Sequence, residues 1–158
     1  MSNQVIYQEQ QKTYFILIAV FLVIAVLILI LAIFPSFFGL QSLSWAVKIA
    51  LLIVVLVDAV SFWCFKELTI IVDNENLSFG FGFMKRQFSW NNLKSAQAAD
   101  FDLKNYLGYG IRFGKDKSIA FAAQGGRGVR LKTTGKDYFF SCTNPEKLAN
   151  LINEKIKS

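Results

Sequence analysis

Hydrophobic residues form two long blocks in the N-terminal part of the chain. The first, residues 14–34, has no polar or charged side chain after its opening tyrosine, and the second, residues 43–65, is interrupted by the charged residues Lys48 and Asp58. An α-helix rises about 1.5 Å per residue, so each block is long enough to cross a bilayer core of roughly 30 Å. The stretch between them, residues 35–42, contains Pro and Gly, which favour a turn. The pattern predicts an antiparallel hairpin of two transmembrane helices.

A cleaved signal peptide and a buried helical hairpin of a soluble protein are the other interpretations of these blocks. The first block is longer than the core of a signal peptide, the segment before it is nearly neutral, and no small-residue cleavage site follows it. A stretch of this length without a polar atom also suits lipid better than a protein interior. The transmembrane hairpin is therefore the favoured interpretation.

The distribution of Lys and Arg predicts the orientation of the hairpin. The loop 35–42 contains neither residue, whereas basic residues flank the other ends of the two blocks at Lys12, Lys66, Lys85 and Arg86. Because cytoplasmic segments are enriched in Lys and Arg, we expect residues 1–13 and 66–158 in the cytoplasm and the loop outside the plasma or inner membrane. Aromatic residues typical of membrane interfaces lie near the ends of the blocks, at Tyr14, Trp45, Phe62 and Trp63.

The two charged residues of the second block are candidate functional residues within the membrane. Lys48 is near the outer end, where its long side chain can reach the headgroups. Asp58 precedes Lys66 by about 12 Å of helix, and a carboxylate at such a depth costs on the order of 2.5–3.5 kcal/mol. Between Phe15 and Phe34 no side chain can donate a hydrogen bond to it, and Ser61 is too weak a partner. Asp58 is therefore protonated, hydrated, or bonded across an interface to another chain.

The pattern changes after residue 65 to short runs rich in Phe, Ile, Val and Tyr, separated by Gly, Asn and Asp, which is typical of β-strands. In residues 77–83, Leu and Phe alternate strictly and predict one apolar face. Strands are expected at 66–72, 77–83, 86–90, 93–99, 109–113, 118–123, 129–132 and 138–142, with a polar loop at 100–107. Turns at 124–128 and 134–137 are expected to join the last three strands as hairpins.

The C-terminus carries the signals of an amphipathic helix. Asn144 is a good N-cap, Pro145 fits the first helical position, and Glu146 suits the positive end of the helix dipole. Apolar residues then recur at helical spacing, at Leu148, Leu151, Ile152 and Ile156. Residues 66–158 are thus predicted to form seven or eight antiparallel strands closed by one helix, so the expected fold class of the whole chain is α+β.

Several short motifs follow one another in a fixed order within residues 66–158. They are Phe88-Ser89-Trp90, Leu93-Lys94-Ser95-Ala96, Tyr109-Gly110-Ile111-Arg112, Gly128-Val129-Arg130-Leu131 and the run from Tyr138 to Leu148. In this order they resemble the bacterial pleckstrin-homology-like (PH-like) domains found behind one or two transmembrane helices. The resemblance implies an antiparallel β-barrel capped by one helix and set at a membrane, and it implies no reaction. The phosphoinositide site of eukaryotic PH domains is not expected, because the first hairpin, residues 73–76, is acidic.

Composition limits the chemistry that the chain can perform. Apolar residues make up 54% of the sequence, the mean hydropathy is +0.40, and there is no His, which removes the commonest general acid/base and metal ligand. Cys64 and Cys142 form no CxxC pair. Each is expected to act as a small buried hydrophobe, with a disulfide between them as the other option. We therefore expect neither an enzyme nor a bound cofactor or metal.

The formal net charge of +6 lies entirely in the C-terminal part, because Lys12 and Lys48 are balanced by Glu9 and Asp58. One basic set is a candidate contact for anionic lipid or a partner: Lys115, Lys117, Arg127, Arg130 and Lys132. The plainer interpretation is a solvated positive face near an anionic leaflet, where each charge is worth about 1 kcal/mol.

Two further binding modes are weaker. The run from Gly125 to Gly128 has the composition of an anion-binding nest, although a plain hairpin turn is favoured. The isoelectric point of about 9.4 suits nucleic acid, but the positive-inside bias explains the charge, and no RRM, OB or helix-turn-helix signature is present. We therefore expect no nucleic-acid partner.

The sequence is most consistent with a scaffold or protein-interaction module anchored in the lipid bilayer, with a protein partner or a homo-oligomer as the expected assembly. The alternative is an accessory subunit of a membrane transport or channel-type complex that uses Asp58 within the bilayer. The anchored module is the favoured function, because a single hairpin with one buried carboxylate is too little for transport by itself.

The predicted topology is tested by thiol labelling in intact cells. A cysteine introduced by Ser42→Cys should react with a membrane-impermeant reagent, because the loop is expected outside. The matched variant Lys136→Cys should react only after permeabilisation, with the wild-type chain labelled in parallel as background. Labelling of Lys136→Cys in intact cells would contradict the topology.

Overall fold

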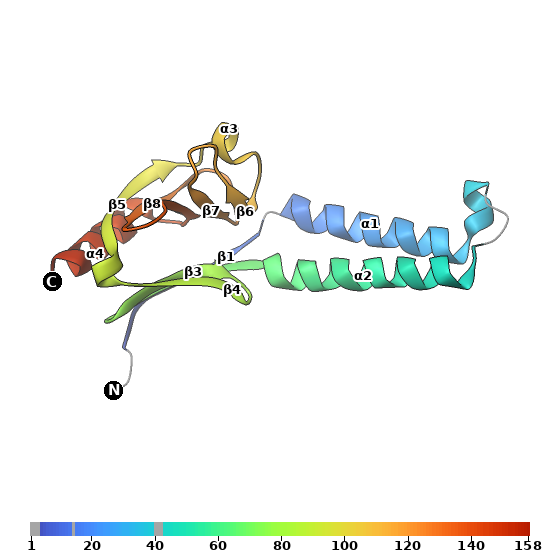
Figure 1. Ribbon diagram of the computed structural model, residues 1–158, viewed down its shortest axis with the longest axis horizontal. Coiled ribbons are helices and arrows are strands. Elements are labelled where there is room, and N and C mark those ends of the chain that lie inside the picture. Colours follow the sequence, from blue (N-terminus) through green and yellow to red (C-terminus); the bar gives the residue numbers. More distant parts are fainter. Residues whose placement is uncertain (1–3, 14, 40–42) are drawn as a thin grey trace. The chain divides into compact units, whose positions relative to one another are not determined.

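The computed structural model describes residues 4–13, 15–39 and 43–158. The chain divides into two compact units (Figure 1): residues 14–64 form a helical unit, and residues 1–13 together with residues 65–158 form a β-rich unit. The helical unit is therefore an insertion in the sequence of the β-rich unit. Tyr14 and the predicted loop residues 40–42 lie outside the described residues.

The helical unit contains α1 (Phe15–Ile33), the short 3-10 helix η1 (Pro35–Phe38) and α2 (Trp45–Phe65). Among the described residues, α2 is the one helix long and apolar enough to cross a membrane, and the apolar stretch found in α1, Ala19–Ile33, is shorter. Gly39 ends η1 with a φ of +73°, a conformation that glycine adopts without strain. The prediction of a membrane span is thus supported for the second block.

The first sheet of the β-rich unit has the antiparallel order β1-β2-β3-β4. Its strands are β1 (Val5–Lys12), β2 (Glu67–Asp73), β3 (Asn76–Phe81) and β4 (Met84–Ser89). Strand β1 was not predicted, because the sequence pattern places residues 1–13 in a segment separate from the β-rich domain. It pairs along β2 from Val5 opposite Asp73 to Lys12 opposite Glu67. Its inward residues are mostly polar, so the apolar alternation that reveals other strands is missing.

The second sheet has the order β5-β8-β9-β7-β6. Its strands are β5 (Leu93–Asp100), β6 (Gly110–Phe113), β7 (Ile119–Ala122), β8 (Arg127–Thr133) and β9 (Tyr138–Ser141), and the helix α3 (Leu103–Tyr106) lies in the predicted polar loop. Strand β9 returns from β8 by the expected hairpin and then lies parallel to β7. The prediction of a hairpin turn at 124–128 is therefore wrong, because β9 separates β7 from β8.

The predicted closed β-barrel is also wrong. The described strands form two separate sheets, four strands in one and five in the other, and the second sheet is mixed rather than purely antiparallel. The broader prediction of an α+β fold with a C-terminal helix packed on a sheet is confirmed. A closed barrel would require both β1 and β4 to pair with edge strands of the second sheet, and neither pairing occurs in the described part of the chain.

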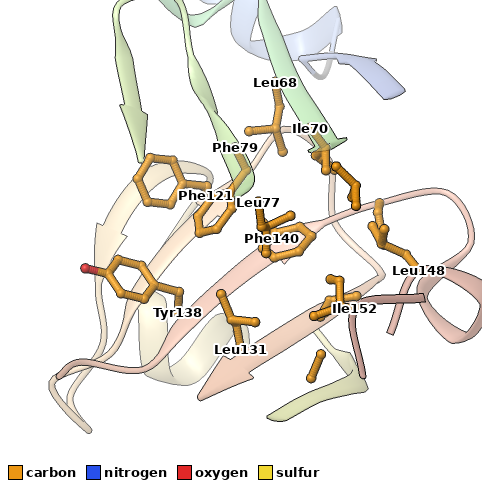
Figure 2. Close-up of a cluster of buried hydrophobic side chains, with 14 of the residues drawn as sticks. Leu68, Ile70, Leu77, Phe79, Phe121, Leu131, Tyr138, Phe140, Leu148 and Ile152 are labelled. Atoms are coloured by element: carbon orange, nitrogen blue, oxygen red, sulfur yellow. The ribbon is translucent and has the colours of Figure 1, made fainter. Parts of the chain in front are cut away.

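The main core lies between the two sheets, where the period-two pattern of the strands directs alternate side chains inward. Figure 2 shows Phe79, Phe121 and Phe140 among the aliphatic residues of this cluster. The ring of Phe79 stacks on Phe140 at 4.5 Å between centroids and meets the edge of Phe121 at 5.3 Å. Phe83, which was expected on the same face, instead lies in the β3–β4 turn and is 76% exposed. Burial of each of the other Phe side chains stabilises the unit by about 1.5–3 kcal/mol.

A smaller cluster covers the opposite face of the second sheet. It consists of Tyr106, Ala120 and Phe139, with Ala99 and Phe101 packed against it. The hydroxyl of Tyr106 hydrogen-bonds that of Ser118 at 2.7 Å, so burial of this Tyr leaves its polar atom satisfied. The short helix α3 is thereby held against the sheet.

The C-terminal helix α4 (Pro145–Lys157) forms as the sequence predicted. The Asn144 side chain accepts a hydrogen bond from the Lys147 backbone N–H at 3.2 Å, and Leu148 and Ile152 are fully buried in the main core. Asn153 adds a contact that the pattern did not reveal. Its side-chain amide accepts from the N–H of Ala96 at 2.9 Å and donates to the carbonyl of the same residue at 2.8 Å, which satisfies the outer edge of β5.

The contribution of β1 can be measured without the helical unit. The backbone N–H of Thr13 donates to the Lys66 carbonyl at 2.9 Å, so an Asn-Gly turn placed between these two residues can replace residues 14–65 as a tight hairpin. We expect this joined domain to resist urea better than the fragment 66–158 by about 2 kcal/mol or more, because the fragment loses several backbone hydrogen bonds worth about 0.5–1.5 kcal/mol each. Equal unfolding free energies by circular dichroism would contradict the role of β1.

Candidate functional site

Asp58 is half-buried within α2, and no described residue forms a hydrogen bond or ion pair with its carboxylate. The nearest candidate in sequence, Ser61, donates its hydroxyl hydrogen to the Val57 carbonyl at 2.8 Å instead. That bond is the usual way in which a helical Ser satisfies itself. Asp58 therefore has no hydrogen-bond or ion-pair partner within the described residues.

Lys48 lies in the first turn of α2, beside an aromatic residue. Its ammonium nitrogen is 5.3 Å from the centroid of the Trp45 ring, a cation–π geometry. Trp and Lys at a helix end are typical anchors at a membrane interface. Lys48 and Asp58 are about 15 Å apart along the helix, so the structure does not bring these two charges together.

The five residues of the predicted basic set are not equivalent. Arg127 forms ion pairs with Asp100 at 3.3 Å and with Glu146 at 2.5 Å, and Arg130 pairs with Asp116 at 3.3 Å. Surface pairs of this kind contribute about 0–1 kcal/mol to stability. Two of the five predicted contacts thus hold parts of the β-rich unit together, Arg127 at the start of α4 and Arg130 at the loop before β7.

Two of the three acidic partners of these arginines, Glu146 and Asp116, are held in their charged form. A hydrogen bond from its own backbone N–H in the first turn of α4, aided by Arg127, lowers the pKa of Glu146. Partial burial opposes ionisation of Asp116, but hydrogen bonds from Ser118 and Asn105 and the charge of Arg130 outweigh it and lower the pKa of this carboxyl. Both ion pairs are therefore intact at neutral pH.

Lys115, Lys117 and Lys132 are the exposed remainder of the set. The first two flank Asp116 in the loop between β6 and β7, and Lys132 follows Arg130 by two residues on β8, on the same face of the sheet. Among the described residues none of these three ammonium groups has an ion-pair partner. They remain a candidate contact for anionic lipid or a partner.

The glycine-rich run 125–128 has a packing role. A Cβ at Gly128 would lie 2.2 Å from the Phe140 carbonyl oxygen, and one at Gly125 would lie 2.7 Å from the Tyr109 hydroxyl. Side chains would thus collide with the neighbouring strand and loop at both positions. The close approach of the Phe140 backbone accounts for Gly128, and that of the Tyr109 side chain accounts for Gly125.

A polar network on β1 was missed by the sequence analysis. One oxygen of Glu9 accepts hydrogen bonds from the Thr143 backbone N–H at 2.7 Å and from its hydroxyl at 2.6 Å, and Tyr7 donates to the other oxygen at 2.5 Å. The Ser141 hydroxyl donates to the side-chain amide oxygen of Gln11 at 2.8 Å. These bonds tie β1 to the end of β9 where no strand pairing exists. The alternation of Tyr7, Glu9 and Gln11 was the signal that could have revealed it.

The ionisable groups around this network are held in their neutral forms. Burial, with Glu9 adding its charge and a hydrogen bond, raises the pKa of Tyr7. Burial also raises the pKa of the Cys142 thiol to about 12, with Glu9 and Glu146 contributing. Cys142 and Cys64 are both free and buried, so Cys142 packs as an unreactive thiol at neutral pH.

The four edge strands of the two sheets differ in how their outer edges are covered. The edge of β5 is satisfied by Asn153, β1 has an irregular register near Val5, and β6 is short and begins at Gly110 with a φ of +86°. Strand β4 is six residues long with a regular register and exposed Lys85, Arg86 and Gln87. Among the edge strands of the described part of the chain, β4 is thus the one with a regular register over its whole six-residue length.

Chemistry beyond these contacts is limited within the described residues, where no group of three or more His, Cys, Asp or Glu side chains is placed to hold a metal ion. Comparison of the chain with protein-family models, with curated proteins and with solved structures finds no match in any of the three. The candidate sites are therefore Asp58 in α2, the exposed lysines and the edge of β4.

The role of Asp58 is tested by crosslinking in native membranes. If its carboxylate bonds across an interface, Asp58→Leu should weaken the crosslinked assembly and Asp58→Asn should keep part of it, because the amide still forms hydrogen bonds. Ser61→Ala is the matched control, since that hydroxyl bonds within its own helix. Identical crosslinked ladders for wild type and Asp58→Leu would remove the interface and leave a protonated or hydrated residue.

Proposed function

We propose that this protein is a non-catalytic interaction module anchored in the plasma or inner membrane. The helices of residues 14–64 form the membrane anchor, and the β-rich unit presents a binding edge to a protein partner in the cytoplasm. The order of a four-stranded sheet, a second sheet and a C-terminal helix supports the proposed relationship to PH-like domains. The mixed second sheet differs from the purely antiparallel strands that this relationship implies.

The pairing of β1 with β2 is the observation that supports two membrane crossings. β1 precedes α1 and β2 follows α2, yet the strands exchange backbone hydrogen bonds and so lie on one side of any membrane. A chain that leaves and returns to the same side crosses an even number of times. Since α2 is long and apolar enough to span, the proposal has the segment containing α1 cross as well. The Lys and Arg residues that flank the helices on the β-rich side favour a cytoplasmic location for the β-rich unit.

The edge of β4 is the surface that best suits a protein partner. An extended peptide can add to an open strand through backbone hydrogen bonds, and side chains then set specificity. Phe81 and Met84 close a two-residue hairpin, so the backbone groups of Lys85 and Gln87 point to the free edge. The positive charge of Lys85 and Arg86 favours an extended segment that carries acidic residues.

Asp58 supports a second candidate function, an accessory subunit of a membrane transport or channel-type complex. A half-buried carboxylate in α2 with no partner among the described residues suits a contact between helices of different chains. The crosslinking of Asp58 variants separates this candidate from the first, because binding at β4 does not require Asp58.

The β4 proposal is tested by photocrosslinking in native membranes. A photoreactive residue at Ser89, near the end of β4, should form an adduct with a discrete partner that mass spectrometry can identify. Gln87→Pro should abolish the adduct, because proline removes an outward N–H while the β3–β4 hydrogen bonds remain. Gln87→Ala should keep it.

Position Asn150, exposed on α4, is the matched control for the photoreactive residue. It should give no adduct with the same partner. An adduct that persists unchanged in Gln87→Pro, or that forms equally from Asn150, would show that the β4 edge is not the binding surface.

A further inference from the structure

One end of the β-rich unit is defined by the two points where the chain passes to and from the helices. The backbone N–H of Thr13 donates to the Lys66 carbonyl at 2.9 Å, and the Thr13 hydroxyl donates to the Phe65 carbonyl. The β1–β2 ladder thus continues to the last residues before the membrane anchor. If α2 spans a membrane, this end of the unit lies at the membrane surface, whatever the orientation of the remainder.

The β3–β4 turn lies at this same end. The start of β2 is opposite the end of β3, with Leu68 facing Phe81, and the rings of Phe81 and Phe65 are 5.6 Å apart. The chain then turns at Gly82 and Phe83 before β4 begins. Gly82 has a φ of +48°, which allows the tight turn.

Phe83 projects from this turn without cover, since 76% of its surface is exposed. The neighbouring Phe residues of β3, by contrast, are fully buried. A large aromatic side chain at the tip of a two-residue turn contributes nothing to the core of the β-rich unit. Beside the boundary of a membrane, such a side chain lowers its free energy by entering the lipid.

The charge around Phe83 suits an anionic surface. Lys85 follows it by two residues, and Lys12 and Lys66 lie at the two chain crossings, all three with exposed side chains. The acidic residue of this end is Glu67, which is half-buried opposite Lys12. Each Lys near an anionic leaflet is worth about 1 kcal/mol of attraction.

We propose that the Phe83 turn is a membrane-contact site that inserts its aromatic ring at the headgroup–acyl boundary of an anionic leaflet, with Lys12, Lys66 and Lys85 on the lipid phosphates. The site rests on the membrane anchor of the proposed function and not on the β4 partner. It gives the β-rich unit a third attachment to the membrane surface, in addition to the two chain crossings.

The experiment uses the full chain reconstituted in phosphatidylcholine vesicles with or without phosphatidylglycerol. An environment-sensitive fluorophore is attached to the variant Phe83→Cys. The matched control is Phe113→Cys, because Phe113 is exposed to a similar extent, 74%. Phe113 ends strand β6, three residues beyond Gly110, which adjoins Phe65. Wild-type protein is labelled in parallel, since Cys64 and Cys142 are buried. Lipids that carry a quencher near the headgroup report insertion at positions 83 and 113, and lipids that carry the quencher in the acyl chain report insertion at position 56.

We expect strong quenching at position 83 in vesicles that contain phosphatidylglycerol and little at position 113. Lys85→Glu should lower the ratio of inserted to free label by about 30-fold, the effect of two charges at about 1 kcal/mol each. Equal quenching at positions 83 and 113 would overturn the contact site. Insertion at 83 that is unaffected by phosphatidylglycerol and by Lys85→Glu would overturn the role of the anionic lipid.

A label at Leu56→Cys separates failure of this inference from failure of the anchor. Leu56 lies within α2 and is 65% exposed. Deep quenching at 56 without quenching at 83 would overturn the contact site and leave the anchor intact, whereas no quenching at either position would overturn both. A label at 83 that is shielded in native membranes but not quenched in vesicles would assign Phe83 to a protein partner instead.

Discussion

Pairing between β1 and β2 is the interaction on which the rest of the structure depends. The two strands are separated in the sequence by the whole helical unit, yet they pair from Val5 opposite Asp73 to Lys12 opposite Glu67. The loop between them is long, but loop-closure entropy grows slowly with length, and a preformed helical hairpin shortens the effective loop. Once formed, the pairing brings both ends of the membrane segment to one side and places β1 where its polar face can reach β9.

The two sheets are held together by different interactions on different sides. Between them, the aromatic cluster around Phe79 forms the dry core. Beside β1, Glu9 and Gln11 replace strand pairing with side-chain hydrogen bonds to Thr143 and Ser141. Such a network is stable because each of its donors and acceptors has a partner. On the remaining side, β4 and β6 stay separate, and the unit keeps an open edge that a closed barrel would have removed.

Cations serve two purposes in this protein. The arginines of the basic set are paired with carboxylates, Arg127 with Asp100 and Glu146 and Arg130 with Asp116. Arg suits this role because its planar group bonds several acceptors at once. Lysines instead occupy exposed positions, where a flexible ammonium group can meet diffuse negative charge. The proposed binding by the exposed lysines and the ion pairs of the arginines are thus separable by mutation.

The sequence by itself determined the features that arise from local chemistry. The long apolar blocks, the strands with apolar alternation and the cap of α4 at Asn144 all follow from neighbouring residues, and the structure agrees with them over the described residues. The sequence also identified Asp58 as a candidate site, because a carboxylate in an apolar block can be recognised from the residue pattern. Tertiary structure alone decided the position of β9 between β8 and β7, the pairing of β1 and the acidic partners of Arg127 and Arg130. These depend on contacts between residues far apart in the chain. A polar strand such as β1 lacks the apolar alternation that marks the other strands, because its inward face is satisfied by hydrogen bonds from Thr143 and Ser141 rather than by burial of apolar side chains.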